Sequence, residues 1–361
     1  MPVPPSTARE RPPRIGVLLV NLGTPAAPTA AALRRYLNQF LSDPRVVELP
    51  RWLWKPILWL LVLPLRPARS AAKYAAIWTP DGSPLAVHSA KQRTLLLGYL
   101  GQRLKAAGLP ADLCPVEIGM RYGGPSMAAA VQKLVAGHCD RILVLPLYPQ
   151  YAASVTASTF DEASRVVRRE RKVPGLRFVA GFHDDPGYIR ALARHLNDEW
   201  MKHGRPDHFV LSFHGIPQRS VARGDPYADQ CRRTAALLVR ELGLDDGTWT
   251  LSFQSRFGRA RWLEPYTAGV LEALGRQRTG RVDVFCPGFV ADCLETLEEI
   301  GIEGRDTFRK AGGGELRLIP CLNEHPAFLA ALTDLTLREL GGWLPAQPAA
   351  SRAATQTSKG P

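Results

Sequence analysis

Short runs of apolar residues alternate along the chain with longer segments in which apolar positions recur every three or four residues. Apolar runs bounded by turn residues indicate buried strands, and the longer periodic segments indicate amphipathic helices. The pattern predicts strands at residues 15–22, 116–120, 141–147, 176–180, 208–213, 248–253, 282–286 and 316–319. It predicts helices at residues 29–41, 89–107, 126–137, 158–170, 185–202, 228–243, 264–274, 292–303 and 327–340.

Alternating strands and helices, with strands that are apolar along their whole length, are typical of parallel sheets covered by helices on both faces. We therefore predict an α/β protein with two doubly wound Rossmann-like domains, each built on a four-stranded parallel sheet. A single (β/α)₈ barrel is the alternative, although irregular spacing and a stretch at 45–85 that we expect to be non-helical argue against it. The predicted divisions are a disordered tail at 1–13, a first domain at 14–174, a second at 175–325, a C-terminal helix at 326–345 packing back on the first domain, and a disordered tail at 346–361.

Composition narrows the class of protein without choosing a partner. The chain has 361 residues, and 46 Lys and Arg against 33 Asp and Glu give a formal net charge of +13. A basic surface attracts nucleic acid, anionic lipid or acidic small molecules alike. The six cysteines include no CxxC pair, which argues against a zinc ribbon, and the N-terminus lacks the apolar core of a secretory signal. We expect a protein of the reducing cytosol.

Residues 52–65, WLWKPILWLLVLPL, break the pattern with eleven large apolar residues. The uncharged part, 56–65, is shorter than the about 20 residues that span a bilayer. Basic residues flank the segment, as in segments that lie in the membrane interface. Two alternatives stay open: a core helix broken by Pro56 and Pro64, or the wall of an apolar ligand cleft.

Candidate catalytic residues follow the predicted strands, because sites in open α/β sheets form at the carboxyl ends of strands. His214 comes directly after the strand at 208–213 and precedes a glycine. Imidazole can accept a proton near neutral pH or bind a metal such as Fe²⁺. A histidine with a purely structural role is the alternative.

The helix predicted at 292–303 carries a row of acids. Asp292 could cap its start, and Glu295, Glu299 and Glu303 follow at spacings of four, which places them on one face. Crowded carboxylates raise each other's pKa and can pass protons or hydrated cations along a line. A solvated acidic helix face is the alternative.

The residues after the other strands are glycines, aromatics and single polar groups, as a cleft for a large flat ligand requires. Trp262 is a candidate wall of that cleft or a core tryptophan, and Arg121 could bind an acidic substituent or pair within the fold. Cys293 is either a soft metal ligand or a buried inert thiol. No GxGxxG follows a strand and GxxxxGK[ST] and HExxH are absent, so dinucleotide, ATP and metalloprotease sites have no support.

These motifs together resemble the ferrochelatase family, whose members insert Fe²⁺ into a porphyrin. The similar blocks are VNLGTP (20–25), LPLYPQY (145–151), VLSFHGIP followed by RGDPYADQC (210–231), FQSRFG…W (253–262) and CPGFVADCLETLEEI (286–300). They occur in the family's order and together cover about residues 14–340. The resemblance implies a class II chelatase-like fold that binds no nucleotide and holds the porphyrin between its two domains.

The resemblance also implies roles for individual residues. His214 matches the histidine that takes pyrrole protons or binds the metal, and Glu295 matches its acidic partner, so we expect both in catalysis and in metal binding. Glu299 and Glu303, with Asp292, are the expected acidic relay behind them. The residues expected to line the porphyrin are Leu22, Arg121, Tyr122, Tyr148, Trp262 and Phe289. The segment 45–85 falls where the family has its active-site lip, which we expect to touch a membrane through 52–65.

Substrate and cofactor expectations complete this picture. Coproporphyrin-using members carry a tyrosine where Leu22 stands, so Leu22 and the apolar lip favour protoporphyrin IX. We expect Fe²⁺ as substrate and no permanently bound cofactor. Animal members of the family carry a [2Fe–2S] cluster on cysteines mostly in a C-terminal extension, and because no cysteine follows Cys321 we expect no such cluster here. We expect no nucleic-acid partner, a monomer or dimer, and a cytoplasmic location at the inner face of the membrane. A cobalt-inserting chelatase and a non-catalytic porphyrin carrier remain alternatives.

Overall fold

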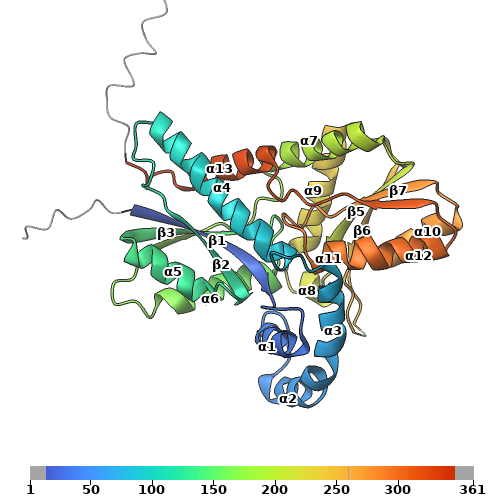
Figure 1. Ribbon diagram of the computed structural model, residues 1–361, viewed down its shortest axis with the longest axis horizontal. Coiled ribbons are helices and arrows are strands. Elements are labelled where there is room, and N and C mark those ends of the chain that lie inside the picture. Colours follow the sequence, from blue (N-terminus) through green and yellow to red (C-terminus); the bar gives the residue numbers. More distant parts are fainter. Residues whose placement is uncertain (1–13, 259, 346–361) are drawn as a thin grey trace, which may run out of the picture.

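The computed structural model describes residues 14–258 and 260–345, and the predicted tails at 1–13 and 346–361 lie outside them. Two four-stranded parallel sheets form the frame (Figure 1). The first has the order β2-β1-β3-β4, with β1 (Arg14–Thr24), β2 (Val116–Gly123), β3 (Cys139–Pro146) and β4 (Gly175–Phe178). The second has the order β6-β5-β7-β8, with β5 (His208–His214), β6 (Trp249–Gln254), β7 (Arg281–Phe285) and β8 (Glu315–Leu318). The predicted fold class is confirmed, and the barrel alternative is wrong.

Each predicted helix overlaps a helix of the structure. Those of the first half are α1 (Ala30–Leu41), α4 (Pro84–Ala106), α5 (Met127–Ala136) and α6 (Ser158–Val167), the last preceded by a π-helical turn, η2 (Ala153–Ala157). Those of the second half are α7 (Pro186–His203), α8 (Gln218–Ala222), α9 (Tyr227–Leu242), α10 (Thr267–Arg276), α11 (Leu294–Leu297), η3 (Glu299–Gly304), α12 (Arg305–Lys310) and α13 (Pro326–Glu339). Of these, α8 and α12 and the π-helical character of η2 and η3 were not predicted.

The predicted domain boundary at 174/175 is wrong. Strand β4, which starts at Gly175, pairs in parallel with β3 and completes the first sheet, so the first domain extends beyond it. The flexible-looking RKVPG sequence at 171–175 is the turn into this edge strand, not a linker. The C-terminal helix α13 packs against α7 and α4, and α4 covers β1 and β2, so the end of the described chain contacts the first domain.

The stretch 45–85, expected to be non-helical, is mostly helical. It forms α2 (Arg51–Ile57), a π-helical turn η1 (Leu58–Val62) and α3 (Leu63–Ile77), which project with α1 from the body of the two sheets (Figure 1). Pro64 lies in the first turn of α3, a position that tolerates proline better than a helix interior, and the π turn η1 directly precedes it. The prolines therefore do not end the helical path.

This helical lip is amphipathic. Leu58 and Leu63 are buried against α1, whereas Trp52, Leu60 and Leu65 are 78%, 73% and 71% exposed. The interpretation of 52–65 as a core helix is therefore wrong for most of its side chains. Among the described residues, no helix is both long enough and apolar enough to cross a membrane.

Candidate active site

His214 ends strand β5, beside Gln254 at the end of β6. Its Nδ1 lies 2.6 Å from the carbonyl oxygen of Gly215. A carbonyl can only accept, so Nδ1 is the donor of this hydrogen bond, and in the neutral imidazole the lone pair is then on Nε2. His214 is therefore oriented as a base or metal ligand through Nε2.

Two aromatic side chains flank this imidazole. The ring centroids of Trp262 and Phe289 each lie 6.4 Å from that of His214. Gly215 makes the close packing possible, because a Cβ there would lie 2.9 Å from the Gln254 carbonyl oxygen and 3.2 Å from Cε3 of Trp262. The structure thus brings together three of the predicted residues, and the partly buried rings form a wall beside the histidine.

The predicted acids Glu295 and Glu299 lie next to the end of β6. The backbone N–H and hydroxyl of Ser255 both donate to the Glu299 carboxylate at 2.6 Å, and Gln254 Nε2 donates to the backbone oxygen of Glu295 at 2.6 Å. Burial raises the pKa of Glu299, an effect that the Ser255 hydrogen bonds and the nearby His214 oppose. A carboxyl with a raised pKa close to an imidazole is suited to exchanging protons with it.

The prediction of one regular helix at 292–303 is wrong. Only Leu294–Leu297 form an α-helical turn, and the chain then widens into η3, where Glu299 and Glu303 lie. Such π turns occur often at functional sites, because the extra residue re-aims side chains. Here the turn packs closely at Gly304, where a Cβ would meet Leu271 at 3.1 Å.

The prediction that Asp292 caps the start of this helix is wrong. Cys293 is the N-cap residue, and the Asp292 carboxylate accepts hydrogen bonds from Asn323 Nδ2 at 2.7 Å, Thr296 Oγ1 at 3.1 Å and the backbone N–H of Cys321 at 3.2 Å. Because its oxygens are occupied by this loop, Asp292 joins two segments of the second domain. Its predicted place in an acidic relay gains no support from these contacts.

Arg121 and Tyr122 are turned into the protein. The Arg121 guanidinium is ion-paired with Asp43 and donates to Ser158 Oγ at 2.7 Å. The fully buried Tyr122 hydroxyl donates to Asp43 Oδ2 at 2.8 Å. Of the two expectations for Arg121, binding an acidic substituent or pairing within the fold, the structure supports the second. Asp43 already supplies the carboxylate that pairs with its guanidinium.

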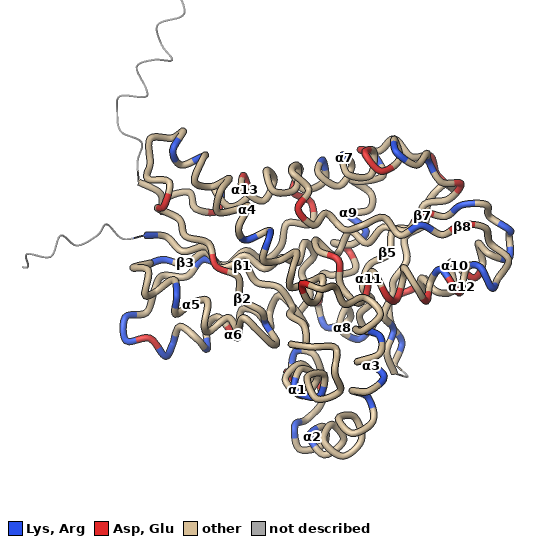
Figure 2. The backbone as a smooth tube through the Cα atoms, viewed as in Figure 1, with Lys and Arg blue, Asp and Glu red and all other residues tan. Residues whose placement is uncertain are grey.

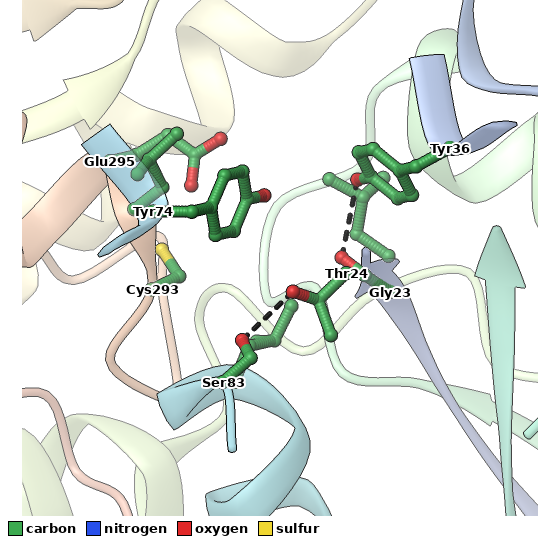
Figure 3. A pocket seen from close by; sticks show the side chains of 10 residues that line it. Gly23, Thr24, Tyr36, Tyr74, Ser83, Cys293 and Glu295 are labelled. Atoms are coloured by element: carbon green, nitrogen blue, oxygen red, sulfur yellow. Dashed lines mark hydrogen bonds between the residues drawn. The ribbon is translucent and has the colours of Figure 1, made fainter. Parts of the chain in front are cut away.

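Leu22 and Glu295 both line a narrow pocket between the two domains, and Figure 3 shows Glu295 on the same side of it as Tyr74 and Cys293. The other lining residues shown there include Tyr36, Tyr74 and Cys293, and the free space is about 10 Å³, room for one water. Burial, and next the nearby Glu295 charge, raise the pKa of Tyr74 and of Cys293, so both stay neutral beside the acid.

Sequence reasoning missed Tyr36 and Tyr74 as site residues. The available signal for Tyr74 was its place near the end of the lip, whereas Tyr36 has the helical spacing of an ordinary core residue. Tyr148, predicted to line the porphyrin, has a buried hydroxyl without a hydrogen-bond partner among the described residues, and burial raises its pKa.

The sequence model of the family described as Ferrochelatase matches residues 14–340. The chain belongs to the ferrochelatase family. A relative named Ferrochelatase from Aromatoleum aromaticum is 55% identical over 355 residues, which cover 98% of this chain and 96% of that protein. Another from Azoarcus sp. is 56% identical over 335 residues, 93% of this chain and 90% of that protein.

Solved structures bear on the fold. The structure titled SirB from Bacillus subtilis with Fe3+ has a TM-score of 0.52 at 16% identity, covering 91% of this chain and 97% of that one. This likeness agrees with the two-domain chelatase architecture. Family membership makes this protein a metal chelatase, and the family's activity is the insertion of iron into a porphyrin during haem synthesis.

Proposed function

We propose that the protein inserts Fe²⁺ into protoporphyrin IX to form protohaem, with release of two protons. The observation that carries the proposal is the His214 imidazole, fixed through Nδ1 so that Nε2 is the ring nitrogen left to accept a proton, near the Glu299 carboxyl, whose pKa burial raises. Insertion requires a group that removes two pyrrole N–H protons as Fe²⁺ binds the ring nitrogens. An oriented neutral imidazole is the side chain that does this near neutral pH.

Each proton then needs a route away from the ring. In the proposed sequence His214 Nε2 takes the pyrrole proton, Glu299 accepts it, and Glu303 passes it to solvent, where the Glu303 side chain is 54% exposed. Glu295, whose backbone oxygen accepts from Gln254 at the end of β6, orients His214 and relays charge. Trp262 and Phe289 hold the ring by apolar contact, and bending the macrocycle to expose its nitrogens draws on this binding energy.

The proposed porphyrin is the less acidic one. Leu22 adds an apolar side chain to the pocket that Glu295 also lines, and the exposed side chains of the lip are largely apolar. Arg121, which could have met a carboxylate, is already paired with Asp43. These features favour a porphyrin with few acidic substituents over one with many, because a buried carboxylate without a partner is costly.

The substrate test follows porphyrin fluorescence under anaerobic conditions with Fe²⁺ and either protoporphyrin IX or coproporphyrin III. We expect rapid loss of fluorescence with protoporphyrin IX and a slower loss with coproporphyrin III. The reverse preference would overturn the argument from Leu22, and binding of both rings without metallation would indicate a carrier. Faster insertion of Co²⁺ than of Fe²⁺ would indicate the cobalt chelatase.

The proposed location is the cytoplasm, with the lip resting on the inner face of the cytoplasmic membrane. Trp59 is 56% exposed and Leu60 73% exposed on the same lip, with Arg51 and Lys55 close to them in the chain. Tryptophan with apolar and basic neighbours is the composition of a helix lying in the membrane interface. A lipophilic porphyrin could then enter from the bilayer.

Liposome flotation with anionic vesicles tests this contact. Trp59→Ser/Leu60→Ser should lose most of the bound fraction, because two exposed apolar side chains no longer enter the interface. Met201→Ser is the matched control, since Met201 is 85% exposed on α7, away from the lip. Equal flotation of both variants and the unaltered protein would rule out the lip as the contact.

A further inference from the structure

Lys73, on the lip helix α3, joins two carboxylates of the second domain, Glu298 just before the π turn η3 and Glu303 within it. Its Nζ donates to Glu303 Oε1 at 2.7 Å and to Glu298 Oε2 at 3.0 Å. Burial alone would lower the pKa of Lys73, but the hydrogen bonds to Glu303 and Glu298 outweigh it and raise that pKa. Figure 2 shows the basic positions of α3 beneath the acidic ones that follow α11, and α3 and α11 are in contact.

The ammonium stands at the outer end of the acidic row. Glu303 is the row's exposed member, whereas the side chain of Glu298 is 8% exposed. Two converging carboxylates attract a hydrated divalent cation, and here a single lysine fills the position between them. Glu298 also needs this partner, because a buried carboxylate without one is strongly disfavoured.

We infer that Lys73 closes the outer end of the acidic row to divalent cations, so that the row carries protons outward and iron reaches His214 by another side. A proton can move between carboxylate oxygens and water while the ammonium stays in place. A hydrated dication would have to displace an ammonium held by two hydrogen bonds at 2.7 and 3.0 Å. The inference rests on the proposed proton route through Glu299 and Glu303.

Mn²⁺ binding to the purified full-length protein, followed by electron paramagnetic resonance, tests the exclusion without any turnover. Lys73→Met should gain a site that binds Mn²⁺ about tenfold or more tightly than the unaltered protein, because a positive charge is removed beside two negative ones. Adding Glu298→Gln and Glu303→Gln should abolish the gain. Lys55→Met is the matched control, since the Lys55 ammonium lies over the Trp59 ring at 5.6 Å.

Lys73→Gln is the second variant if Lys73→Met does not fold, since its amide keeps a hydrogen-bond donor while removing the charge. No gain of Mn²⁺ binding in the folded variant would overturn the inference. Equally, a site in the unaltered protein that Glu303→Gln removes would show that the lysine excludes nothing. The Mn²⁺ measurement does not depend on iron insertion. Failure of the inference about Lys73 can therefore be told apart from failure of the proposed function.

Steady-state kinetics give the second readout. With Glu303→Gln, kcat should fall because proton exit slows, while the KM for Fe²⁺ stays within about twofold of that of the unaltered protein. A large increase in the KM for Fe²⁺ with kcat retained would mean that iron enters along the row, and the inference would be wrong.

Discussion

Asp43 lies between α1 and the lip helix α2. Replacing Asp43 should lower the free energy of unfolding far more than replacing an ordinary surface acid. Its side chain is 4% exposed and accepts hydrogen bonds from Arg121, from the Tyr122 hydroxyl at 2.8 Å and from Ser158 Oγ at 2.6 Å. Asp43→Ala leaves the largely buried Arg121 guanidinium without its counter-charge. Breaking one side of a buried ion pair costs about 3–5 kcal/mol.

Urea denaturation followed by tryptophan fluorescence gives the free energy of unfolding of each variant. Asp161→Ala is the control, because its carboxylate pairs with Arg45 at 2.8 Å but is 46% exposed, and such pairs contribute about 0–1 kcal/mol. A loss below about 1 kcal/mol for Asp43→Ala would refute the buried pairing. In that case Arg121 would be available to a substrate carboxylate after all.

Two further predictions concern the catalytic half. Burial raises the pKa of Glu299 above its ordinary 4.5, so the folded protein favours the protonated carboxyl and ionisation of Glu299 opposes folding. The stability that the protonated carboxyl contributes is fully present below pH 4.5 and is lost as pH rises through the folded-state pKa. Glu299→Gln should therefore be more stable than the unaltered protein at pH 8 but not at pH 4, while inserting iron slowly; an equal difference at both pH values would contradict this. Gly215→Ala should cost about 1–3 kcal/mol and most of the activity, since a Cβ there meets neighbours at 2.9 and 3.2 Å. Its control is Gly269→Ala in α10, where nothing lies within 4 Å and stability should not fall, and similar losses in both variants would argue against crowding.

The sequence predicted the frame of this protein well, because its parallel strands are apolar along their length. In β1, Val17, Leu18 and Leu19 are all fully buried, so the strand shows as a continuous apolar run and not as an alternation of apolar and polar residues. His214 was predictable for a related reason. It stands at the carboxyl end of a strand, where the fold alone places a site.

Other features depend on contacts that no local pattern encodes. Arg121 pairs with Asp43, which lies 78 residues away in the chain, and this contact decides that the guanidinium is used within the fold and not for a substrate. Asp292 resembles a helix cap in sequence, but donors from the 321–323 loop reach its carboxylate first. The four-residue spacing of the glutamates predicts a regular helix, and the π turn at Glu299 follows from packing against the rest of the second domain.

The helical lip shows the same limit. Pro56 and Pro64 predict interruption, yet the chain stays helical through α2, η1 and α3, with Pro56 inside α2 and Pro64 in the first turn of α3. Likewise, nothing in the short sequence of β4 says which sheet it joins. That assignment depends on pairing with β3.

The most direct test of the account is the rate of Fe²⁺ insertion by His214→Ala, measured anaerobically with protoporphyrin IX beside the binding affinity for the porphyrin itself. The account predicts that insertion is abolished while porphyrin binding is largely kept, because Trp262 and Phe289 still hold the ring. Turnover retained at a similar rate would show that another group removes the pyrrole protons, and the role given to His214 would be wrong.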